Sequence, residues 1–168
     1  MQRVFGVTGW KNSGKTTLTE RLVAELTWRG WIVSTVKHAH HEFDIDRPGA
    51  DSHRHREAGA REVAVVSGRR WALMHELRHE GEPSLEEILG RLAPCDIVIV
   101  EGYKRESHRK IETRRLGSKD TAPLSPSDPN IVAIAADHPL GDVGLPTFDL
   151  NDIPAIADFV EATTMLTK

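Results

Sequence analysis

Apolar residues recur along this chain in two alternating patterns. Short apolar runs bounded by turn residues or charges predict buried strands, and longer segments with apolar residues three or four positions apart predict amphipathic helices. Residues 96–101 carry the strongest strand pattern, because a continuous apolar run is typical of a parallel strand covered on both faces. The predicted strands are residues 4–8, 31–37, 62–67, 71–77, 96–101 and 131–136. The predicted helices are residues 17–29, a segment after Pro48 that ends near Gly59, a segment that begins at Ser84, and residues 151–161.

The turn between the first predicted strand and helix carries the most informative motif of the chain. Residues 9–16, Gly-Trp-Lys-Asn-Ser-Gly-Lys-Thr, match the phosphate-binding pattern G-x-x-x-x-G-K-[ST] at every fixed position. Backbone N–H groups of such a loop curl around an anion, and the start of the following helix adds its dipole. In this pattern Lys15 reaches the β- and γ-phosphates and the Thr16 hydroxyl binds Mg²⁺. The sequence therefore predicts a site for a nucleoside triphosphate.

This motif and the alternation of strands with helices predict the fold class. We expect an α/β, three-layer P-loop NTPase fold with a mostly parallel central sheet. A length of 168 residues suits a single P-loop nucleotide-binding domain over residues 1–168.

Composition narrows the functional classes. A formal net charge of −3 argues against a general nucleic-acid binder, and no apolar run reaches the ~18 residues that span a membrane. The chain enters a strand directly, so we expect no signal peptide. The single cysteine, Cys95, suits the reducing cytoplasm, where we expect the protein to act.

A magnesium-dependent nucleotide site also needs an acidic group at the carboxyl end of a neighbouring strand. Asp96 and Glu101 bound one predicted strand and lie ~16 Å apart by strand rise, so they cannot share one metal ion. The carboxyl-end rule selects Glu101 and leaves Asp96 as a capping or surface residue.

The polar segment after the second predicted strand is a candidate switch region. Asp44 and Asp46 flank Ile45, so in an extended chain both point to one side and can approach Mg²⁺, and Lys37 can contact a phosphate. Residues 38–55 are also rich in histidine, which leaves a Zn²⁺ or Ni²⁺ site open.

Three segments together resemble the molybdopterin-guanine dinucleotide biosynthesis protein B (MobB) family. They are the phosphate-binding loop with Thr17 and Leu18, the segment Val-Lys-His-Ala-His-His at residues 36–41 with Phe-Asp-Ile-Asp-Arg-Pro-Gly-Ala-Asp-Ser at residues 43–52, and Val-Glu-Gly-Tyr-Lys at residues 100–104. The resemblance implies a GTP-binding protein, usually dimeric, that assists the guanylyltransferase joining GMP to molybdopterin. It further implies GTP at residues 9–17, Mg²⁺ near Thr16 and Glu101, a functional loop over residues 37–46, and a molybdopterin ligand.

These arguments give the predicted site. The catalytic side chains are Lys15, Glu101 and Asp46, and the magnesium ligands are Thr16, Glu101 and Asp46. No N-K-x-D guanine motif is present, and Asp137 after the last predicted strand is the nearest candidate to read guanine, so the residues alone leave ATP open. The nucleotide-binding residues are Gly9, Trp10, Lys11, Asn12, Ser13, Gly14, Lys15, Thr16, Thr17, Lys37 and Asp137.

Other functions remain open at the level of sequence. The histidine-rich segment is compatible with a nickel metallochaperone GTPase. The basic residues 104–115 are compatible with the lid of a small-molecule kinase, or with a solvated charged surface. A module that binds nucleotide without hydrolysing it is a third alternative function.

Overall fold

The computed structural model describes residues 2–39 and 43–167, and its chain forms two compact units. The first unit contains Met1–His38 and Leu85–Lys168, and the second contains Ala39–Ser84. The second unit is thus inserted into the first between two of its elements. The sequence pattern, from which we predicted one domain, contains no signal that separates the two.

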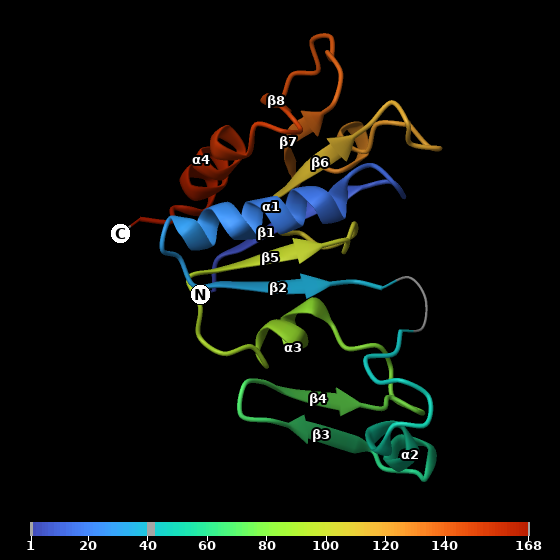
Figure 1. Cartoon of the computed structure of the whole chain (residues 1–168). Helices are drawn as coiled ribbons and strands as arrows, with labels where there is room; N and C mark the ends of the chain where they lie inside the picture. Colours follow the sequence, from blue (N-terminus) through green and yellow to red (C-terminus); the bar gives the residue numbers. More distant parts are fainter. Residues whose placement is uncertain (1, 40–42, 168) are drawn as a thin grey trace. The chain divides into compact units, whose positions relative to one another are not determined.

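The first unit is built on a six-stranded sheet in the order β2-β5-β1-β6-β7-β8, in which every neighbouring pair is parallel. All strands therefore end at the same edge, where the loop after β1 also lies (Figure 1). The elements of this unit are β1 (Val4–Gly9), α1 (Lys15–Trp28), β2 (Val33–Lys37), α3 (Leu85–Leu89), β5 (Ile97–Glu101), β6 (Lys110–Arg114), the 3₁₀ turn η1 (Ser125–Ser127), β7 (Ile131–Ala136), β8 (Thr147–Asp149) and α4 (Ile153–Thr164).

Helices α1 and α4 cover one face of this sheet, and α3 lies on the other (Figure 1). Phe5 and Val7 of β1 are fully buried in the larger core with Leu22 of α1 and Ile156 of α4. Val98 and Val100 of β5 belong to the smaller core beside α3. The predicted P-loop NTPase-like fold is confirmed, with three layers and a parallel sheet.

The two interpretations of residues 104–115, a lid or a solvated charged surface, are wrong for part of this stretch. This stretch is neither a lid nor a solvated surface over its whole length, because residues 110–114 form β6, which lies between β1 and β7. Lys110 and Glu112 are 0% and 1% exposed. Charged residues at alternate positions are typical of an exposed strand, and here they are buried because each has hydrogen-bond partners in the loops before and after β6.

The second unit contains α2 (Asp51–Glu57) and the antiparallel strands β3 (Glu62–Val66) and β4 (Trp71–His75). Both strands were expected from sequence, but they form their own two-stranded sheet instead of joining the parallel one. Arg56 of α2 binds Asp44, Asp46 and Glu76, and these ion pairs hold the segment before α2 to the hairpin.

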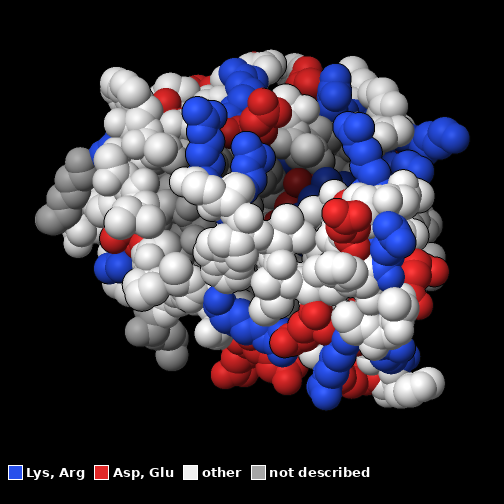
Figure 2. Space-filling view, turned by 60° about the horizontal axis from the view of Figure 1, so that its bottom comes forward, with Lys and Arg blue, Asp and Glu red and all other residues white. Residues whose placement is uncertain are grey.

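Charges of both signs are interspersed on the face that Figure 2 presents, in keeping with the small net charge. Among the described residues, no helix is long and apolar enough to cross a membrane.

Candidate functional site

The loop between β1 and α1 has the backbone geometry of a phosphate cradle. Asn12 and Gly14 have φ angles of 65° and 96°, which turn successive backbone N–H groups toward one side. Gly9 is required by close packing, because a Cβ there would lie 2.4 Å from Ser13 Oγ and 2.5 Å from Thr113 Oγ1. The loop therefore depends on glycine both for its curvature and for its contact with β6.

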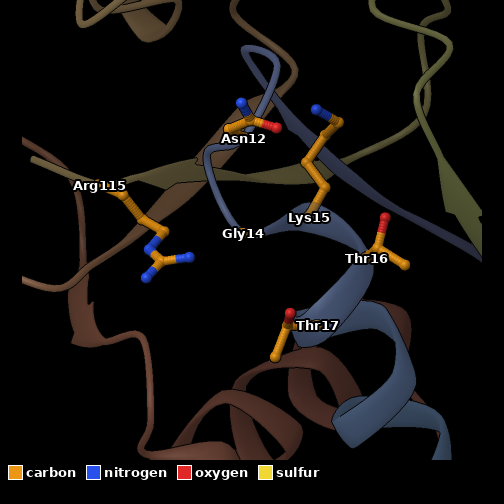
Figure 3. A pocket seen from close by; sticks show the side chains of 6 residues that line it. All are labelled: Asn12, Gly14, Lys15, Thr16, Thr17 and Arg115. Atoms are coloured by element: carbon orange, nitrogen blue, oxygen red, sulfur yellow. The ribbon is translucent and has the colours of Figure 1, made fainter. Parts of the chain in front are cut away.

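Helix α1 begins at this loop with its first N–H groups available to an anion. No side chain caps its amino terminus, and its first turn contains no acidic residue. These N–H groups and the helix dipole together favour a bound anion. A hollow of about 370 Å³ lies in front of them, lined by Asn12, Gly14, Lys15, Thr16, Thr17 and Arg115. Figure 3 shows Arg115 reaching toward the hollow from the side opposite Lys15 and Thr16.

Lys15 is held across the loop by a hydrogen bond of 2.7 Å from its Nζ to the Trp10 carbonyl. Burial lowers the pKa of the Lys15 ammonium, and the nearby Lys104 lowers it further. Glu101 opposes this shift and Lys37 adds to it. Four charged side chains thus lie close together beside the loop, and three of them are cationic. This local positive charge favours the binding of a polyanion.

Glu101, at the carboxyl end of β5, contacts two of the predicted site residues. Its Oε1 accepts a hydrogen bond of 2.8 Å from Thr16 Oγ1 and lies 3.4 Å from Lys37 Nζ. The Glu101 side chain is 8% exposed. A hydroxyl and a carboxylate in contact beside a phosphate cradle are hard oxygen donors of the kind that Mg²⁺ prefers, with phosphate and water completing its coordination. Asp96 lies at the opposite end of β5 and accepts a hydrogen bond of 2.7 Å from the Ile32 N–H.

Strand β6 and the segment after it brace the phosphate-binding loop, a role that the sequence pattern does not reveal. Ser13 Oγ and Thr113 Oγ1 are 2.6 Å apart. Ser118 Oγ donates to the Lys11 carbonyl at 3.0 Å, and Trp10 Nε1 donates to the Ala122 carbonyl at 2.7 Å. These partners are separated by 100 or more positions in the chain, so no local pattern could reveal them.

Asp137 follows β7, on the same edge as the loop. Its Oδ1 accepts a hydrogen bond of 3.1 Å from the Leu116 N–H and lies 2.9 Å from His138 Nδ1, and its Oδ2 lies 3.6 Å from Arg115 Nε. The His138 contact lowers the pKa of the Asp137 carboxyl, against the effect of burial. Asp137 is therefore an ionised acceptor linked to the phosphate hollow through Arg115.

Asp46 belongs to the second unit, where Arg56 binds its carboxylate and lowers its pKa. Its predicted role as a magnesium ligand and catalytic group remains a prediction. His40, His41 and Glu42 of the histidine-rich segment lie outside the described residues. Among residues 2–39 and 43–167, no three side chains of histidine, cysteine, aspartate or glutamate form a metal-binding group.

Comparisons with known proteins agree on one family. Residues 4–137 match the family model of molybdopterin guanine dinucleotide synthesis protein B. The chain is similar to the molybdopterin-guanine dinucleotide biosynthesis adapter proteins of Escherichia coli (40% identical, 90% of this chain and 87% of the relative) and Haemophilus influenzae (39% identical, 94% and 87%). It also resembles the crystal structure of a MobB homolog from Bacillus stearothermophilus, with a TM-score of 0.70 and 32% identity over 96% of this chain and 99% of that one. The chain therefore belongs to the molybdopterin guanine dinucleotide synthesis protein B family, MobB.

Proposed function

We propose that this protein is a GTP-binding adapter in the synthesis of molybdopterin guanine dinucleotide, acting in the cytoplasm beside the guanylyltransferase of that pathway and its molybdopterin ligand. The observation that carries the nucleotide part is the contact of Thr16 with Glu101 beside a phosphate cradle at the end of β1. The biosynthetic part rests on the adapter proteins that the chain resembles.

In this proposal the loop and the start of α1 bind the phosphates, and Lys15 exchanges the Trp10 carbonyl for phosphate oxygens. Thr16 and Glu101 hold Mg²⁺, which supplies charge neutralisation at the β- and γ-phosphates. Asp137 accepts hydrogen bonds from the N1 and N2 groups of guanine, an arrangement that would distinguish GTP from ATP.

Hydrolysis by the isolated protein is expected to be slow, well below ~1 s⁻¹. Fast hydrolysis requires a group that orients water, and the only glutamine, Gln2, lies at the amino end of the sheet, 3.6 Å from Cys95 Sγ. Competition binding of GTP, ATP and GDP with and without Mg²⁺, followed by steady-state phosphate release, tests this. GTP should bind more tightly than ATP or GDP, and its binding should depend on Mg²⁺. Equal binding of ATP or rapid turnover without a partner would exclude the proposed GTP-binding adapter.

Glu101→Gln is expected to weaken the Mg²⁺-dependent part of GTP binding about tenfold or more, since it removes a carboxylate from the metal. The matched control is Asp96→Asn at the other end of β5, which should leave Mg²⁺ dependence unchanged. GTP titrations at several Mg²⁺ concentrations measure both. If Asp96→Asn lost Mg²⁺-dependent GTP binding and Glu101→Gln kept it, the metal would lie at the amino end of β5, which contradicts this proposal.

We further propose that the protein forms a homodimer through the exposed face of the β3–β4 hairpin. On this face Val66 pairs with Trp71 and Ala64 pairs with Leu73. Val66, Trp71 and Leu73 are 74%, 69% and 49% exposed, so apolar side chains gather on a two-stranded sheet that has no other covering in the second unit as described.

Trp71→Arg is expected to convert the dimer into a monomer, because it places a charge in the centre of the proposed contact. Trp28→Arg is the matched control, since Trp28 of α1 is 82% exposed but belongs to the first unit. Sedimentation equilibrium measures both variants. Dissociation of the Trp28 variant with an intact Trp71 variant would place the interface elsewhere.

A further inference from the structure

A second hollow, of about 320 Å³, lies beside β1 and is separate from the phosphate hollow. Its lining residues are Thr8, Lys104, Arg105, Leu124, Ser127, Asp128 and Ile131, and we call it the Thr8 pocket. Val7 points into the core beneath α1, so the next side chain, Thr8, points to the opposite face of the sheet. The Thr8 pocket and the phosphate hollow share no lining residue.

Two buried charges of β6 fix the walls of the Thr8 pocket. Lys110, 0% exposed, donates from Nζ to the carbonyls of Lys104 at 3.0 Å and Glu106 at 2.6 Å. The same ammonium donates to Asp128 Oδ2 at 3.1 Å. One buried cation thus holds together the two loops that carry Lys104 and Asp128, and a pocket built in this way is preorganised.

Glu112 fixes the remaining wall in the same manner. It is 1% exposed and accepts hydrogen bonds from the backbone N–H groups of Leu124 at 2.8 Å and Ser125 at 3.0 Å. Arg114 donates at 2.8 Å to Glu112 Oε2, the oxygen that also accepts from Ser125. The buried charges of β6 thus hold the walls of the Thr8 pocket in place, and these walls include the loop after β5 and the 3₁₀ turn η1.

The Thr8 hydroxyl is a polar group with no partner in the part of the chain that the structure describes. Thr8 is 1% exposed, and its Oγ1 is buried without a hydrogen bond. Buried hydroxyls are nearly always paired, so an unpaired one that lines a hollow indicates a ligand that pairs with it. The Asp128 carboxylate, by contrast, already accepts hydrogen bonds from Lys110 and Asn130.

The remaining charges of the pocket are cationic, and one side of it is apolar. Lys104 and Arg105 supply positive charge, whereas Leu124 and Ile131 supply apolar surface. We propose that the Thr8 pocket binds a small phosphate monoester. Its phosphate accepts hydrogen bonds from Lys104, Arg105 and the Thr8 hydroxyl, and its organic part lies against Leu124 and Ile131.

The Thr8 pocket adjoins the nucleotide site through Lys104. The Lys104 Nζ lies 3.9 Å from the centre of the Trp10 ring in the phosphate-binding loop. The positive charge of Lys104 also contributes to the lowered pKa of Lys15. A monoester bound here therefore lies next to the nucleotide without occupying its site. The assignment of the pocket itself does not depend on GTP binding.

The experiment is a titration of the full-length Lys15→Ala protein, in which phosphate attraction by the nucleotide loop is reduced. The probes are phenyl phosphate, inorganic phosphate and benzyl alcohol, and the binding of each is monitored through the NMR resonances of the backbone amides. Phenyl phosphate is expected to bind most tightly and to shift the amides of Leu124 and Ser127. Equal binding of inorganic phosphate would overturn the assignment of an ester, and equal binding of benzyl alcohol would overturn the assignment of an anion. Shifts confined to residues 14–17 would overturn the pocket.

Two variants separate ligand binding from a structural role. Thr8→Val and Arg105→Gln should each weaken phenyl phosphate binding about fivefold or more, whereas Arg109→Gln, the matched control at an exposed arginine outside the pocket, should not. Because the Thr8 hydroxyl is unpaired, Thr8→Val should keep or raise the melting temperature while it loses affinity. A lowered melting temperature with unchanged affinity would show that the hydroxyl is structural.

GTP titrations of Thr8→Val and Arg105→Gln, each in a protein that retains Lys15, test the Thr8 pocket separately from the proposed GTP binding. Both variants should bind GTP as the parent does. Failure of the parent to bind GTP would overturn the nucleotide proposal and leave the phenyl phosphate result standing, and the reverse outcome would overturn only the Thr8 pocket.

Discussion

Replacing Lys15 by alanine is expected to lower GTP affinity by about 100-fold or more and to leave the fold intact. The ammonium would otherwise bind two phosphate groups, and each charge-assisted hydrogen bond contributes ~1.5–3 kcal/mol. Stability should change little, because burial and Lys104 lower the pKa of Lys15 and so disfavour its charged form in the folded protein. Equilibrium GTP binding and thermal unfolding of the same samples measure the two effects.

The control for this substitution is Lys119→Ala. Lys119 is an exposed lysine on the loop after β6 and does not line the phosphate hollow. Both variants lose one positive charge, so a general effect of charge on GTP affinity would appear in both. An unchanged affinity in Lys15→Ala would remove the basis for a nucleotide site at the β1–α1 loop.

Acidification is expected to destabilise the protein through His108. Both of its ring nitrogens are buried without a partner among the described residues, and burial, aided by Lys110, lowers its pKa to about 4, against the opposing charge of Asp128. The unfolded chain binds the proton at the ordinary value of 6.5, so stability is complete above that pH and is lost as pH falls toward 4. After allowance for solvent screening the loss is about 1–3 kcal/mol.

Urea unfolding at pH 7.5 and pH 4.5 measures this effect, with His108→Phe as the test variant and His79→Gln as the control. His79 is exposed, so the control should lose as much stability on acidification as the parent. The His108 variant should lose less by about 1–3 kcal/mol. An identical acid response in all three proteins would mean that His108 is protonated as readily in the folded chain as in the unfolded one.

The elements predicted correctly are those whose signal is local. The strand that ends at Gly9 and the helix after it follow from hydrophobic spacing. The position of Glu101 at the carboxyl end of β5, beside Thr16, is as expected, whereas its role as a metal ligand stays a prediction. The prediction that Asp96 lies far from Glu101 is confirmed, because the two flank β5 at opposite ends.

The missed elements are too short for a periodic pattern or depend on partners outside the element itself. The pattern Lys-Ile-Glu-Thr-Arg of β6 is typical of an exposed strand, and only Asp128 and the loop carbonyls that pair with Lys110 make its burial favourable. Strand β8 has three residues, too few for a periodic pattern. The brace from Ser118 to the Lys11 carbonyl likewise joins two loops, and loops carry no repeating signal.

The insertion of the second unit between β2 and α3 has a consequence for synthesis on the ribosome. Strands β1 and β2 emerge early, but β5 lies between them in the sheet, so neither can complete its native pairing until residues 97–101 have been made. The hairpin β3–β4 pairs residues close in the chain and emerges before β5. Local pairing forms quickly and distant pairing slowly, so we expect the β3–β4 hairpin to form during translation, before the six-stranded sheet receives β5.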